Sequence, residues 1–115
     1  MKLFPLYHWS PTERRKSIIR HGLKVRKPHV VHSKGEWQAE YLCFSKSPSH
    51  AWGLSGGMGH DWHGVEEWDL WMVWSNRLDR PQKLYPETSG LSEYRIRHDV
   101  PKRDIWYVGS RSMKK

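Results

Sequence analysis

The pattern of hydrophobic and polar positions predicts a chain made mainly of short strands. Residues 67–75 place large apolar side chains on both faces of an extended segment, and a strand that is apolar on both faces belongs in the middle of a sheet. Residues 92–98 instead alternate, with Tyr94 and Ile96 on the core side and Glu93, Arg95 and Arg97 on the other. The same reasoning predicts short strands over 3–9, 29–32, 40–45 and 106–108.

Two Ser-Pro pairs indicate where helices begin. Ser10 suits the N-cap of a helix over residues 11–21, because Pro11 fits the first helical position and Glu13 completes a capping box. Ser47 repeats the device and opens a second short helix, which we expect to end before the glycine-rich segment 53–64.

The first helix has a defined inner side and a defined end. Ile18 and Ile19 are expected to supply its buried side, and Gly22 is expected to take the left-handed position that ends it. Together with about six short strands, these two helices predict a single α+β domain over residues 1–115, dominated by β-structure. Residues 110–115 read as a flexible basic tail.

The charge of the chain favours polyanionic partners. Lys and Arg number 20 against 12 acidic residues, which gives a formal net charge of +8. Such an excess favours nucleic acid, nucleotide phosphates or an acidic protein surface without choosing among them. The basic segment 24–38 is the first candidate for contact with a phosphate backbone, and a solvated loop is the alternative. The N-terminus lacks a long apolar run, so we expect a cytoplasmic protein with no membrane partner. We also expect a monomer.

The composition limits other chemistry. Cys43 is the single cysteine, so no intramolecular disulfide can form, and its apolar strand predicts an inert thiol. His60, Asp61 and His63 offer metal-ligand types near Glu66 and Glu67, but their spacing matches no defined zinc pattern, so we expect no metal. Eight Trp and five Tyr can fill a core or supply stacking surfaces, and core filling is the expected use of most of them.

Four landmarks occur in an order that resembles the ADP-ribosyltransferase superfamily, the diphtheria-toxin and poly-ADP-ribose-polymerase type. They are His8-Trp9-Ser10 before a helix ending at Gly22-Leu23, the segment 41–48 (YLCFSKSP) followed by Ala51, the apolar strand at 68–74, and Glu93–Ile96 (EYRI) running into Val100-Pro101. They span residues 6–108 and look like a small phage- or toxin-type member. The resemblance implies a split β-sandwich that binds NAD between its two sheets. It also implies a cytoplasmic location, in the host if the protein is encoded by a phage.

The resemblance assigns roles by position. His8 would hydrogen-bond the adenosine-side ribose of NAD, the Trp9 backbone would hold the nicotinamide carboxamide, and Glu93 would be the catalytic acid that orients the ribose 2′-hydroxyl and the acceptor. The aromatic ring that stacks on nicotinamide is ambiguous, because Tyr41 is the tyrosine of the segment while the family's ring commonly lies nearer Cys43 or Phe44. The further residues that would contact NAD are Ser10, Ser45 and Arg95.

Several functions remain open on this reasoning. The leading one is transfer of ADP-ribose from NAD to a macromolecular acceptor, either nucleic acid or a host protein. A tRNA 2′-phosphotransferase is a variant within the same fold. The alternatives are a non-catalytic basic module of this fold, which binds nucleic acid or a host protein, and a nucleic-acid-binding domain of unrelated β-rich fold. Arg95 and Arg97 would bind phosphate, keep Glu93 ionised, or form an ordinary ion-pair ladder.

Overall fold

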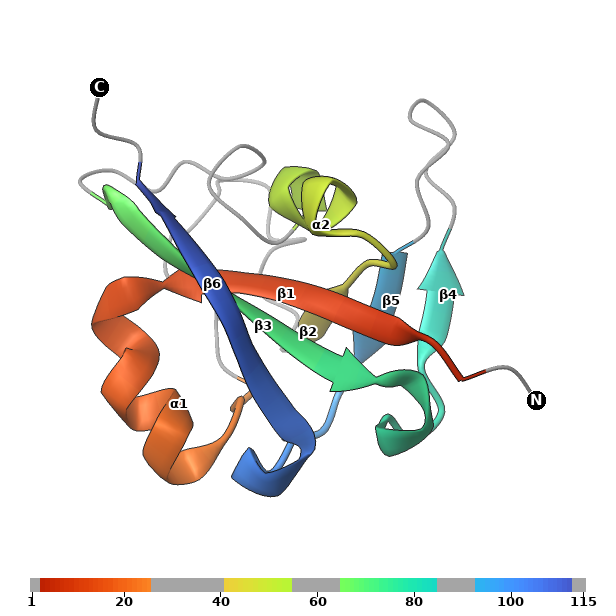
Figure 1. Cartoon of the computed structure of the whole chain (residues 1–115). Helices are drawn as coiled ribbons and strands as arrows, with labels where there is room; N and C mark the ends of the chain where they lie inside the picture. The colour runs from red at the N-terminus through yellow and green to blue at the C-terminus, as the bar shows by residue number, and fades with distance from the viewer. Residues whose placement is uncertain (1–2, 26–40, 55–64, 85–92, 113–115) are drawn as a thin grey trace, which may run out of the picture.

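The computed structural model describes residues 3–25, 41–54, 65–84 and 93–112 (Figure 1). In that part of the chain the fold is α+β, dominated by strands and with two short α-helices, as the sequence predicts. Its six strands form two antiparallel sheets. The elements in chain order are β1 (Pro5–Pro11), η1 (Thr12–Arg14), α1 (Arg15–His21), β2 (Leu42–Phe44), α2 (Pro48–Leu54), β3 (Glu67–Trp74), η3 (Ser75–Arg77), β4 (Gln82–Leu84), β5 (Glu93–Ile96), η4 (Lys102–Asp104) and β6 (Ile105–Ser112).

Each sheet has three strands. The first sheet has the order β1-β3-β6 and the second β2-β5-β4, with every neighbouring pair antiparallel. The central position of β3 confirms the expectation drawn from its two apolar faces. β1 and β2 also meet, because Tyr7 and Ser45 exchange backbone hydrogen bonds of 2.7 and 3.1 Å. This bridge joins an edge strand of one sheet to an edge strand of the other.

The two faces of β3 contribute to two separate apolar clusters. Trp71 and Val73 belong to the main core, which lies between the sheets. Trp68 and Leu70 belong to a tryptophan core beneath α2. The main core consists of Leu6, Ile18, Leu23, Leu42, Phe44, Trp71, Val73, Leu78, Tyr94, Ile96 and Val100. The tryptophan core consists of Trp9, Ala51, Trp52, Trp68 and Leu70.

The start of the first helix differs from the expectation. Ser10 does not cap it: Ser10 is buried in β1 opposite Asp69, and the helical turn begins at Thr12 after Pro11, without a side-chain capping bond. The capping box with Glu13 is therefore also wrong. Apolar burial and pairing with β3 hold the Ser10 position in the strand, and those tertiary terms outweigh the local preference for a cap.

The inner side and the end of this helix are only partly as expected. Ile18 is buried, but Ile19 is 59% exposed, because a helix this short presents a narrow stripe to the core. Gly22 has a φ of 83°, so the expected positive φ is confirmed, but its ψ of −171° and its place at the C-cap differ from the expected left-handed helical C′ position. A Cβ at this position would lie 2.2 Å from the backbone oxygen of Val100, so the close approach of another segment also requires glycine here.

The second helix begins as predicted. The Ser47 hydroxyl accepts a hydrogen bond from the His50 backbone N–H at 3.2 Å, and Pro48 occupies the first helical position. α2 continues to Leu54, beyond the expected end of the helix at the glycine-rich segment.

The C-terminal half contains two corrections. β4 forms at residues 82–84, inside what the sequence indicates as a polar connection, because three residues without a clear alternation give no strand signal. β6 runs to Ser112, so residues 110–112 belong to a strand and not to a flexible tail. The expected strand at 29–32, most of the basic segment 24–38, residues 55–64 with their candidate metal ligands, and residues 113–115 lie outside the described residues.

Candidate active site

The candidate site lies where β1 and β2 meet. The His8 side chain hydrogen-bonds through Nδ1 to the backbone oxygen of Cys43 at 2.8 Å. Its ring also packs on Phe44, with ring centroids 5.4 Å apart. The Tyr7–Ser45 bridge next to this contact fixes the register in which β1 delivers His8 to β2.

Glu93 reaches the same cysteine from β5. The Cys43 thiol donates a hydrogen bond to Glu93 Oε2 at 3.2 Å, and the same oxygen pairs with the Nε of Arg95. Cys43 stands opposite Arg95 in the β2–β5 register, so Cys43, Glu93 and Arg95 share one face of the second sheet. His8 and Glu93, which come from the first and the last sequence landmark, therefore both contact Cys43, which comes from the second.

Glu93 is buried even though it lies on the face opposite the core residues Tyr94 and Ile96. The strand alternation is as predicted, but the side chain is only 5% exposed, which contradicts a plain surface position. A buried carboxylate requires a compensating charge or hydrogen bonds, and Arg95 and the Cys43 thiol supply them. Of the roles considered for Arg95, holding Glu93 is the one that its contacts show.

An aromatic ring completes the cluster. The guanidinium of Arg95 lies over the Tyr41 ring, 4.4 Å from its centroid, and that of Arg97 lies 5.9 Å from it. Burial and the neighbouring Cys43 raise the pKa of Tyr41 to about 12, against the opposing effect of Arg95. We use the term Cys43 cluster for His8, Tyr41, Cys43, Glu93 and Arg95.

The thiol in the cluster is held in its neutral form. Burial, followed by the charge and hydrogen bond of Glu93, raises the pKa of Cys43 well above its ordinary value. Burial alone would lower the pKa of Arg95, but its hydrogen bond to Glu93 and the charge of that carboxylate raise it instead. A thiol held neutral in this way is a poor nucleophile, since the thiolate is the reactive form.

The other predicted site residues lie around this cluster in different ways. The Trp9 side chain is buried in the tryptophan core and donates through Nε1 to the Pro48 oxygen at 2.9 Å. The backbone N–H and C=O groups of residues two apart in a strand point to the same side. Those of Trp9 therefore point to the same edge of β1 as those of Tyr7, which bond to Ser45. Phe44 and Ser45 are fully buried.

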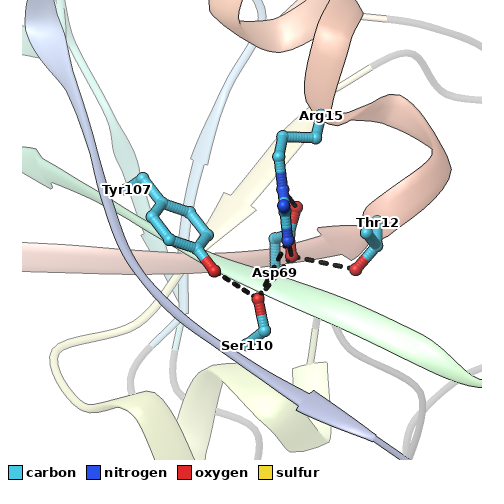
Figure 2. Close-up of polar contacts among 5 residues, drawn as sticks. All are labelled: Thr12, Arg15, Asp69, Tyr107 and Ser110. Carbon is cyan, nitrogen blue, oxygen red and sulfur yellow. Dashed lines mark hydrogen bonds and ion pairs between the residues drawn. The ribbon is translucent and has the colours of Figure 1, made fainter.

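A second polar cluster, which the sequence analysis did not find, holds the first sheet together (Figure 2). Asp69 is fully buried in β3 and accepts two hydrogen bonds from Arg15, at 2.7 and 2.8 Å. It also accepts one from Thr12 at 2.9 Å and one from Ser110 at 2.7 Å, and the Tyr107 hydroxyl contacts Ser110. The signal was a carboxylate placed between two large apolar residues of the strand, Trp68 and Leu70, which requires a partner when buried.

The Asp69 cluster differs from the Cys43 cluster in the number of hydrogen bonds that its buried carboxylate accepts. Its carboxylate accepts four hydrogen bonds, and its members come from η1, α1, β3 and β6. Burial alone would raise the pKa of Asp69, but the bonds from Arg15, Ser110 and Thr12 lower it below the ordinary value. These contacts explain a structural role, because every carboxylate oxygen is committed to tying elements together.

Comparison with protein-family models and with curated protein sequences finds no match to this chain. The arrangement of its own residues therefore carries the functional argument. Across the ranges that the structure describes, no helix is long and apolar enough to cross a membrane.

Proposed function

We propose that the protein is an NAD-dependent ADP-ribosyltransferase whose site is the Cys43 cluster. The observation that carries this proposal is the convergence of His8 and Glu93 on Cys43, one at its backbone oxygen and one at its thiol. The resemblance assigned His8 to the adenosine-side ribose of NAD and Glu93 to the ribose 2′-hydroxyl and the acceptor, although 85 positions separate the two residues in the chain. Two sheets that meet at β1 and β2 also agree with a split β-sandwich.

The reaction needs few catalytic groups. The bond between the ribose C1′ and the nicotinamide nitrogen breaks, and neutral nicotinamide leaves with the bonding electron pair. A nucleophilic oxygen or nitrogen of the acceptor forms the new bond to C1′, and the proton that it loses passes to a carboxylate or to water. The ribose carries positive charge in the transition state, so a nearby carboxylate stabilises that state more than the bound substrate.

Glu93 is the carboxylate positioned for this role. Arg95 and Cys43 hold it in one orientation, which avoids the cost of ordering it during the reaction. The His8 ring, supported by Phe44 and bound to the Cys43 oxygen, is a positioning group for the adenosine-side ribose. Tyr41, stacked on Arg95, is a partly exposed aromatic ring of this cluster and suits contact with nicotinamide.

The test is nicotinamide release from NAD by the whole chain, with DNA, RNA or a cell lysate as acceptor. Glu93→Gln keeps the shape of the side chain and removes its charge, so we expect release to fall by about 10²–10³-fold. Glu13→Gln, at an exposed glutamate of η1, is the matched control and should leave the rate unchanged. Circular dichroism and a thermal melt establish that Glu93→Gln is folded.

The outcomes separate the enzyme from the non-catalytic alternative. Release that depends on Glu93 and not on Glu13 supports the transferase, and the additive that stimulates it identifies the acceptor class. If wild-type protein neither releases nicotinamide nor binds NAD by calorimetry, the enzyme proposal is wrong, and the chain is better described as a basic binding module.

A further inference from the structure

β6 exposes an unusual combination of aromatic and basic side chains. It is an edge strand of the first sheet, and Trp106 is 57% exposed on it. Lys102 and Arg103 of η4 are exposed just before the strand begins, and Arg111 is exposed near its end. Figure 1 shows β6 in blue, with η4 at its start beside the end of α1. We call Lys102, Arg103, Trp106, Gly109 and Arg111 the β6 surface.

Three of these residues project from one face of the sheet. In the β3–β6 register Trp106 lies opposite Met72, Gly109 opposite Leu70, and Arg111 opposite Trp68, and these β3 residues share one face. A Cβ placed at Gly109 would meet nothing within 4 Å, so the step between Trp106 and Arg111 is open. The Arg111 guanidinium is held above the Trp52 ring, 4.1 Å from its centroid. The result is an exposed indole, an open step and a fixed cation along about 16 Å of strand.

The charge of η4 and β6 is mainly positive, although the exposed Glu67 of β3 lies opposite Ser112. Residues 102–112 contain three basic residues and one acidic residue, Asp104, which faces Arg77 at 3.7 Å. A polyanion therefore complements this side of the molecule.

A second copy of the chain is a poor partner for the same strand. The register shifts between Leu70 and Trp71, which leaves Val108 as an extra residue in β6, and a bulge disrupts the regular edge that strand pairing needs. An exposed tryptophan beside cations instead matches the stacking and phosphate contacts by which proteins bind single strands.

We infer that the β6 surface binds single-stranded nucleic acid, with a base stacked on Trp106 and phosphates held by Lys102, Arg103 and Arg111. Binding of this kind needs neither NAD nor Glu93. The further idea that the bound strand is the acceptor of ADP-ribose rests on the proposed function.

The test measures the fluorescence anisotropy of labelled 12-nucleotide dT and U strands with the whole chain, without NAD, over a range of salt concentrations. We expect the logarithm of the binding constant to fall with the logarithm of salt at a slope of about −2, as three phosphate contacts on a single strand predict. Trp106→Ala should weaken binding about tenfold through the lost stacking. Gly109→Leu should weaken it similarly by filling the open step, without a change in charge. Lys46→Ala, which removes an exposed cation that lies over the Phe4 ring, is the control and should stay within about twofold.

Each result decides the inference. Tight single-strand binding that Trp106→Ala and Gly109→Leu both weaken supports it. Absence of binding at low salt, equal binding by all variants, or equal affinity for a duplex overturns it, as does a dimer in sedimentation that Trp106→Ala dissociates. The Glu93→Gln variant should bind strands like wild type. If the wild-type protein binds strands but neither releases nicotinamide nor binds NAD, the proposed function is wrong and this inference stands.

Discussion

Replacement of Asp69 by asparagine tests whether the Asp69 cluster holds the first sheet together. Asparagine keeps the shape but presents an amide to a guanidinium that donates two hydrogen bonds to Asp69. Removing one partner of a buried ion pair costs about 3–5 kcal/mol. The Arg15 side chain is 41% exposed and can turn toward water, which reduces this cost. We therefore expect Asp69→Asn to lower the free energy of unfolding by about 2–3 kcal/mol.

Thermal and urea unfolding, followed by circular dichroism, measure this loss. For a chain of 115 residues, a loss of that size lowers the melting temperature by roughly 10 °C. Asp99→Asn is the matched control: its ion pair with Lys24 is exposed on both sides, so it should cost about 1 kcal/mol or less. Equal losses in the two variants would refute the reasoning.

The pH dependence gives a second check on the same variant. The pKa of Asp69 is lower in the folded protein than in the unfolded chain, so its stabilisation is fully present above the unfolded value, near 4. It is lost as the pH falls through the folded pKa. The stability difference between wild type and Asp69→Asn should therefore be constant near neutral pH and shrink in acid, and a difference that persists unchanged at the lowest pH where both fold would contradict the assignment.

Two further predictions follow from single residues. The pKa of Cys43 is raised in part by Glu93, so alkylation of this single cysteine by iodoacetamide at pH 7.5 should be slow in wild type and faster in Glu93→Gln. Equal rates in the folded proteins would show that the charge of Glu93 does not act on the thiol. Gly22→Ala should lower the free energy of unfolding by about 2–4 kcal/mol, because its Cβ would meet the Val100 oxygen at 2.2 Å and its φ is positive, and a loss below 1 kcal/mol in urea unfolding would refute the close approach.

The sequence predicted the elements that strong local patterns define. β3 could be placed in the middle of a sheet because both of its faces are apolar, and α2 could be started at Ser47 because the cap and the following proline agree. Ser10 has the same local signal, yet it lies in β1 because pairing with β3 and burial outweigh a cap. The three-residue β4 exists only through its pairing with β5, which local sequence does not encode.

The site shows the same division between local and distant information. Alternation along residues 92–98 correctly put Glu93 and Arg95 on one face of β5. It did not predict that Glu93 is buried or that it contacts Cys43, because both depend on β2, which is distant in sequence. Asp69 was missed for a similar reason: its partners Arg15 and Ser110 come from segments 54 and 41 positions away.

The Tyr7–Ser45 bridge has a consequence for how the molecule responds to a ligand. His8 belongs to one sheet and Glu93 to the other, and among the described residues the edges of these sheets are linked there by the Tyr7–Ser45 bridge and by the His8–Cys43 hydrogen bond. A molecule that contacts both residues would add a further non-covalent link between the sheets. A ligand that binds only when the two sheets are joined stabilises the joined state by its own binding free energy. Tighter ligand binding should therefore make the two sheets harder to separate.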